Sequence, residues 1–120
     1  MITVMVVDDI PSARELVSNY LREAGYQVIS AVDGQEGLQK FEQLKPQVVI
    51  TDLVMPGMSG LELCRAIKKS EQTVPVIACT SKNTELDRMW GLKQGINIYL
   101  TKPFKREELL KAVRSLTGEE

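Results

Sequence analysis

Histidine is absent from this chain of 120 residues, which removes the commonest general base and metal ligand of proteins. Aromatic residues make up only 5% of the sequence, and no basic block or aromatic-interleaved basic stripe occurs. We therefore expect no direct contact with nucleic acid. No apolar run approaches the length that spans a bilayer, and the apolar N-terminus lacks the basic region of a signal peptide. We therefore expect no membrane partner.

Only two cysteines, Cys64 and Cys79, are present, and both fall within apolar patterns without the spacing of a metal site. We expect them to be small buried side chains of a protein in the reducing cytoplasm. With neither histidine nor a reactive thiol to use, chemistry in this chain would rest on carboxylates, hydroxyls and lysine.

What is present is typical of a globular protein, with 43% hydrophobic and 26% charged residues and a net charge of -1. The length predicts one domain over residues 1–120. Short β-branched runs alternate with longer segments of helical period, and this alternation predicts βαβ units with a parallel sheet and five helices. The predicted strands are residues 3–7, 27–31, 48–52, 76–80 and 97–101.

The fourth helical segment, residues 85–94, has the weakest pattern because it contains Gly91. The spacing of Leu86, Met89 and Leu92 predicts an inward apolar stripe. Trp90, the only tryptophan, fits either a core position or, if exposed, an anchor for a protein partner, since aromatic residues dominate interface hot spots.

Polar side chains follow four of the five predicted strands. Asp8 and Asp9 follow the first, Asp52 ends the third, and Thr80 and Lys102 come at the ends of the fourth and fifth. Each residue alone fits an ordinary role, such as a helix cap for the paired acids. Because the carboxyl ends of parallel strands share one edge of the sheet, we expect all of them to lie together in a ligand site.

Carboxylates gathered in this way repel one another, so a cation is expected between them. Oxygen ligands without histidine or cysteine favour Mg²⁺. Beside such an ion the Asp52 carboxylate can attack an electrophilic phosphorus. Lys102 would offset the charge on the phosphoryl oxygens, and Thr80 is placed to donate a hydrogen bond to the product.

Several short motifs occur in a characteristic order: Val7-Asp8-Asp9, Asp52 with Met55-Pro56-Gly57 and Gly60, Thr80-Ser81, and Tyr99-Leu100-Thr101-Lys102-Pro103-Phe104. Together they closely resemble the receiver domain of two-component response regulators, over essentially the whole chain. The resemblance implies a doubly wound, flavodoxin-like α/β fold, with a five-stranded parallel sheet in the order 2-1-3-4-5 and helices on both faces.

The resemblance also implies roles for the acids. Asp52 would accept a phosphoryl group from a phosphohistidine on a histidine kinase or phosphotransfer protein. Asp9, Asp52 and the backbone carbonyl of Val54 would bind Mg²⁺, with Asp8 acting largely through a water molecule.

Thr80 and Tyr99 match the family's switch pair, in which the threonine moves toward the phosphoryl group and the aromatic ring turns inward. The Lys102–Pro103 bond matches a peptide that is cis in the family, as X–Pro bonds can be. The domain would then catalyse only its own phosphorylation and dephosphorylation. It would signal to a downstream protein through its fourth and fifth helices and fifth strand, as in chemotaxis-type and twitching-motility systems.

Two other classes of protein use similar parts. A small Mg²⁺-dependent phosphohydrolase would use Asp52 as a turnover nucleophile, but the sequence offers no obvious specificity cap and no histidine base. A flavodoxin-type cofactor binder would have a phosphate loop after the first strand, where Asp8 and Asp9 would repel the phosphate.

Overall fold

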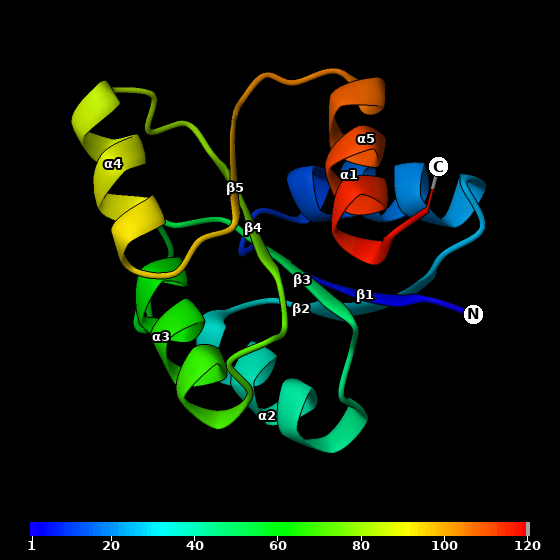
Figure 1. Ribbon diagram of the computed structural model, residues 1–120, viewed down its shortest axis with the longest axis horizontal. Coiled ribbons are helices and arrows are strands. Elements are labelled where there is room, and N and C mark those ends of the chain that lie inside the picture. The colour runs from blue at the N-terminus through cyan, green and yellow to red at the C-terminus, as the bar shows by residue number, and fades with distance from the viewer. Residues whose placement is uncertain (120) are drawn as a thin grey trace.

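The computed structural model describes residues 1–119, in which one parallel five-stranded sheet lies between two layers of helices (Figure 1). The strand order is β2-β1-β3-β4-β5, which confirms the order 2-1-3-4-5. The observed strands agree with the predicted ones to within one residue at each end: β1 (Thr3–Val7), β2 (Gln27–Ala31), β3 (Val48–Thr51), β4 (Val76–Thr80) and β5 (Ile98–Thr101).

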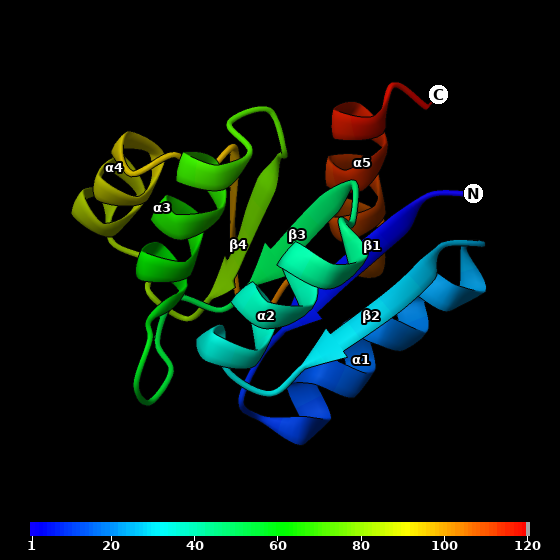
Figure 2. The same ribbon diagram turned by 90° about the horizontal axis from the view of Figure 1, so that it is seen from below.

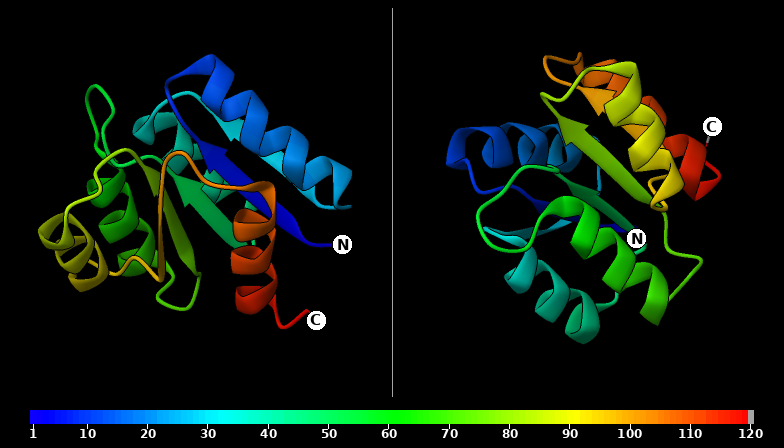
Figure 3. Two further views of the ribbon diagram at one scale, coloured as in Figure 1. Left: turned by 90° about the horizontal axis from the view of Figure 1, so that it is seen from above. Right: turned by 90° about the vertical axis from the view of Figure 1, so that its left-hand side faces the viewer.

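The helices follow the strands in alternation: α1 (Pro11–Glu23), α2 (Gly34–Leu44), α3 (Gly60–Ser70), α4 (Glu85–Lys93) and α5 (Arg106–Thr117). Helices α1 and α5 cover one face of the sheet, and α2 and α3 cover the other (Figures 2 and 3). Helix α4 lies beside α3, next to the edge strand β5 (Figure 1). None of the helices in residues 1–119 is both long and apolar enough to cross a membrane.

The core has two halves, one on each face of the sheet. Phe41 of α2 and Leu63 and Ile67 of α3 belong to one half. Leu21 of α1 and Leu109 of α5 belong to the other. The central strands β1, β3 and β4 are buried along nearly their whole length, as expected for parallel strands covered on both faces. Both cysteines are buried and free, as predicted.

The start of α3 is built tightly against the end of β3. Ser59 caps the helix: its hydroxyl accepts from the Glu62 N–H at 3.2 Å, and the Glu62 carboxylate accepts from the Ser59 N–H at 3.2 Å. A Cβ atom on Gly60 would overlap the backbone carbonyl of Asp52. Only glycine fits this close approach, which keeps the loop after Asp52 compact.

Helix α4 contradicts the predicted inward stripe. Leu86, Met89 and Leu92 are 76%, 60% and 46% exposed, and Gly91 is the buried residue of the helix. A Cβ atom on Gly91 would lie 2.9 Å from Cε2 of Tyr99, so the glycine is what faces the sheet. The apolar side chains therefore point outward, and Trp90, at 53% exposure, is not a core residue.

Candidate functional site

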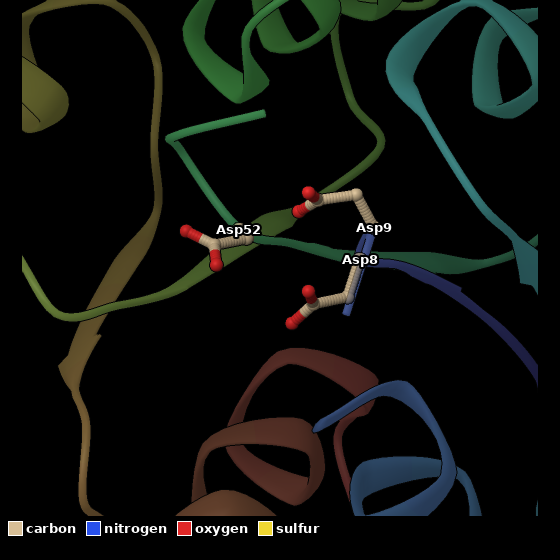
Figure 4. Close-up of side chains that lie close together, drawn as sticks. All are labelled: Asp8, Asp9 and Asp52. Atoms are coloured by element: carbon tan, nitrogen blue, oxygen red, sulfur yellow. The ribbon is translucent and has the colours of Figure 1, made fainter. Parts of the chain in front are cut away.

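Three carboxylates meet at the carboxyl edge of the sheet (Figure 4). Asp8 and Asp9 follow β1, and Asp52 follows the neighbouring strand β3. Val7 pairs with Thr51 in the ladder, and the Asp52 N–H donates to the Val7 carbonyl at 3.0 Å. One oxygen of each acid lies within 4.8 Å of the others. The predicted juxtaposition of the acids is therefore present.

Lys102, which follows β5, joins the same cluster from the other side. Its ammonium lies 3.0 Å from Asp8 Oδ2 and 3.1 Å from Asp52 Oδ2. Burial lowers the pKa of Lys102, but the hydrogen bonds to Asp8 and Asp52 outweigh it, so the net pKa is raised. The side chain is therefore a cation near neutral pH. The Lys102–Pro103 bond is cis, as the resemblance implied.

The buried carboxylates are unequally satisfied. Asp52 Oδ1 accepts from the N–H groups of Leu53 at 2.6 Å and Val54 at 3.2 Å, and Asp8 Oδ1 accepts from the Ile10 N–H at 3.0 Å. Asp9 Oδ1 is buried without a hydrogen-bond partner in residues 1–119. A buried carboxylate oxygen without a partner is costly. The cluster therefore fits a hard divalent cation, which would bind that oxygen.

Thr80 and Tyr99 are both buried and are joined through one residue. The Lys82 N–H donates to Thr80 Oγ1 at 3.3 Å, and the Tyr99 hydroxyl donates to the Lys82 carbonyl at 2.7 Å. The Tyr99 side chain is turned inward, with 4% of the residue exposed, and its burial raises the pKa of the phenol. Thr80 and Tyr99 are thus connected through hydrogen bonds to the backbone of Lys82.

A groove of about 320 Å³ runs between the loop after β3 and helix α4. Val54 and Trp90 line it, with Tyr99 also contributing. Val54 is an exposed residue of this groove. The exposed indole of Trp90 is therefore close to the loop that carries Asp52.

Two arginines near these residues were not predicted from the sequence. Arg14 Nη1 donates to the Asp8 carbonyl at 2.8 Å, and Arg88 Nη1 donates to the Tyr99 carbonyl at 3.2 Å. Both contacts are made by long side chains to backbone oxygens. Neither has a local sequence pattern that could have revealed it.

Comparison with known proteins shows the family of the chain. Residues 4–114 match the family model of the response regulator receiver domain. Protein PilH of Pseudomonas aeruginosa is 39% identical, with 97% of this chain and 98% of that protein covered. Three longer relatives, 35–38% identical, are matched over only 45–49% of their length.

Solved structures agree too. The chemotaxis protein CheY4 of Vibrio cholerae is 35% identical with a TM-score of 0.91, and the alignment covers 97% of this chain and 98% of that one. The response regulator TrrA of Thermotoga maritima, solved in complex with Mg²⁺-BeF, is 35% identical with a TM-score of 0.89, and 97% and 99% of the two chains are covered. These matches do not favour a phosphohydrolase. The chain belongs to the family of receiver domains of two-component response regulators.

Proposed function

We propose that Asp52 is the phosphoacceptor, and that it takes a phosphoryl group from a phosphohistidine on a partner histidine kinase or phosphotransfer protein. The observation that carries this proposal is the convergence of the three carboxylates with the Lys102 ammonium at one sheet edge. Asp52 accepts hydrogen bonds from two backbone N–H groups and from the lysine, whereas Asp8 accepts from one backbone N–H group and from the lysine.

In the transfer, a carboxylate oxygen of Asp52 forms a bond to phosphorus as the phosphorus–nitrogen bond to the donor imidazole breaks. The imidazole leaves with the bonding electron pair and takes up a proton, so that an acyl phosphate and a neutral histidine result. The Lys102 ammonium pairs with the Asp52 carboxylate before the transfer and would pair with the phosphoryl oxygens after it. Its raised pKa keeps it charged for both roles.

Mg²⁺ fits the site as its cofactor. Asp8, Asp9, Asp52 and the backbone carbonyl of Val54 would hold the ion, and Asp8 would do so largely through water. When bound, the ion supplies positive charge that offsets the charge on the phosphoryl oxygens. Two observations support it: Asp9 Oδ1 has no hydrogen-bond partner among the described residues 1–119, and the similar TrrA was solved in complex with Mg²⁺-BeF.

Thr80 and Tyr99 would report the phosphorylation. The Thr80 hydroxyl would donate a hydrogen bond to the phosphoryl group, and Tyr99, already linked to it through Lys82, would hold its inward position. The α4–β5–α5 face would then bind a downstream protein, with Trp90 as an anchor. Likeness to PilH and CheY4, each matched over 98% of its length, supports action through protein contacts.

The domain would act as a switch that catalyses only its own phosphorylation and dephosphorylation, not the turnover of an external phosphoester. We place it in the cytoplasm as one signalling unit over residues 1–120. The buried free thiols of Cys64 and Cys79 are consistent with that reducing compartment.

The test is labelling by a small-molecule phosphodonor such as phosphoramidate, with and without Mg²⁺, followed by intact-protein mass spectrometry. We expect one phosphoryl group on the wild-type protein with Mg²⁺, and none on Asp52→Asn. Glu42→Gln, which removes an exposed carboxylate of α2, is the matched control and should label normally. Equal labelling of Asp52→Asn, or steady hydrolysis of the donor without a protein adduct, would count against the proposal.

A further inference from the structure

Helix α4 meets β5 through two residues that both contact Tyr99. The Arg88 guanidinium carbon lies 5.2 Å from the centre of the Tyr99 ring, and Arg88 Nη1 donates to the Tyr99 carbonyl at 3.2 Å. Gly91 faces the ring at its edge, and a Cβ atom there would lie 2.9 Å from Cε2. Arg88 thus contacts both the ring and the backbone of one residue.

The rest of α4 offers little to hold the helix in place. Three of its four large apolar residues, Leu86, Met89 and Trp90, are more than half exposed, and the fourth, Leu92, is 46% exposed. The buried residue, Gly91, has no side chain to pack. Burial of apolar area therefore contributes little to the docking of this helix. The contacts of Arg88 with Tyr99 therefore contribute a larger share of the energy that docks the helix.

Tyr99 is held on three sides. Its hydroxyl donates to the Lys82 carbonyl, Gly91 limits its edge, and the Arg88 guanidinium lies near the ring. A planar guanidinium can stay near an aromatic ring while one of its N–H groups donates a hydrogen bond, which a lysine ammonium cannot do in the same geometry.

We propose that Arg88 is a positioning residue that holds Tyr99 in its inward orientation and thereby raises the affinity of the Asp52 site for a phosphoryl group. The first half follows from the contacts of Arg88 alone, and the second half rests on the proposed function. If phosphoryl binding requires the inward ring, any loss of the inward population lowers the apparent affinity in proportion. Arg88 acts through Tyr99 and does not itself touch the acids.

The first measurement reads the ring without any ligand. The protein is labelled with fluorotyrosine, its fluorine spectrum is recorded, and Tyr99→Phe assigns the resonance of Tyr99. Arg88→Ala and Arg88→Lys should both shift that resonance toward the position of a solvent-exposed ring, while the signals of Tyr20 and Tyr26 stay fixed. Lys93→Ala, which removes another exposed cation of α4, should shift nothing.

The second measurement is the Kd for beryllium fluoride in the presence of Mg²⁺. Loss of a ring contact and a hydrogen bond of this kind should raise the Kd about fivefold in Arg88→Ala, with Lys93→Ala like the wild type. Gly91→Ala, which crowds the edge of the ring, should move the Tyr99 resonance as well and provides a perturbation independent of charge.

The outcomes separate the two proposals. An unmoved Tyr99 resonance in Arg88→Ala overturns the positioning role, even if the Kd rises. A rise in Kd of the same size in Lys93→Ala overturns it too, because the effect would then come from charge alone. If the wild-type protein binds no beryllium fluoride, the proposed function fails, while the fluorine spectra still decide whether Arg88 positions the ring.

Discussion

Replacement of Lys102 by methionine tests whether the acidic cluster depends on the ammonium that pairs with Asp8 and Asp52. The ammonium makes charge-assisted hydrogen bonds of 3.0 Å to Asp8 and 3.1 Å to Asp52. Methionine keeps much of the length of the side chain and its apolar stem, but leaves both carboxylates without this partner. The perturbation therefore removes charge pairing while changing packing little.

The burial of these three side chains determines how much stability the replacement should cost. Removal of one partner from a fully buried ion pair costs about 3–5 kcal/mol. The Lys102 side chain is 20% exposed, and the two carboxylates are more deeply buried, so solvent screens part of the loss. We expect the free energy of unfolding to fall by about 2–3 kcal/mol without Mg²⁺. Lys69→Met, at an exposed position of α3, should change it by less than about 0.5 kcal/mol.

The assay is urea unfolding near neutral pH in a chelating buffer, repeated with saturating Mg²⁺. The raised pKa of Lys102 means that its stabilisation is fully present below the pKa of an unfolded lysine, so neutral pH measures all of it. Added Mg²⁺ should narrow the gap between Lys102→Met and the wild type, because the ion would neutralise the same carboxylates. A loss of stability no larger than that of Lys69→Met, or a gap that widens with Mg²⁺, would show that Lys102 does not stabilise the carboxylates of Asp8 and Asp52.

Three further predictions follow from other parts of the molecule. Burial raises the pKa of the Cys79 thiol to about 12, and Cys64 is buried too. Neither thiol should react with a thiol reagent in the native protein, and both should react in denaturant. Rapid reaction of the native protein would contradict their burial. Burial, together with a hydrogen bond to Glu119, raises the pKa of Tyr26 from 10.0 to about 12. The protonated phenol therefore stabilises the fold fully below pH 10, and this stabilisation is lost as the pH rises through 12. Unfolding of Tyr26→Phe should show a weaker loss over that range, and an identical pH dependence would disprove the assignment. Trp90→Ala should weaken capture of a downstream protein by the phosphorylated domain without reducing phosphorylation, whereas loss of labelling would place the tryptophan in the phosphorylation site instead.

The sheet and its site were predictable from the sequence because the strands are short, β-branched and buried on both faces. A parallel sheet brings the residues after its strands to one edge, so the topology alone placed Asp8, Asp9 and Asp52 together. The strand order and the cis Lys102–Pro103 bond came from the family resemblance instead, since no local pattern of residues specifies either.

Helix α4 shows where periodicity fails. The spacing of Leu86, Met89 and Leu92 indicates an apolar face but not the direction in which that face points. The direction is decided by close packing between Gly91 and Tyr99, which lie in different elements. The contacts of Arg14 and Arg88 escaped prediction for a related reason, because long side chains reach distant backbone carbonyls without any local pattern.

If Asp52 becomes an aspartyl phosphate, as we propose, chemical trapping can locate that group in the sequence. After reaction with phosphoramidate and Mg²⁺, borohydride reduction converts a phosphorylated aspartate to homoserine, which peptide mass spectrometry can place in the sequence. We expect homoserine at position 52 and aspartate at positions 8 and 9. Homoserine at either of those two positions, or at none of the three, would contradict the proposal.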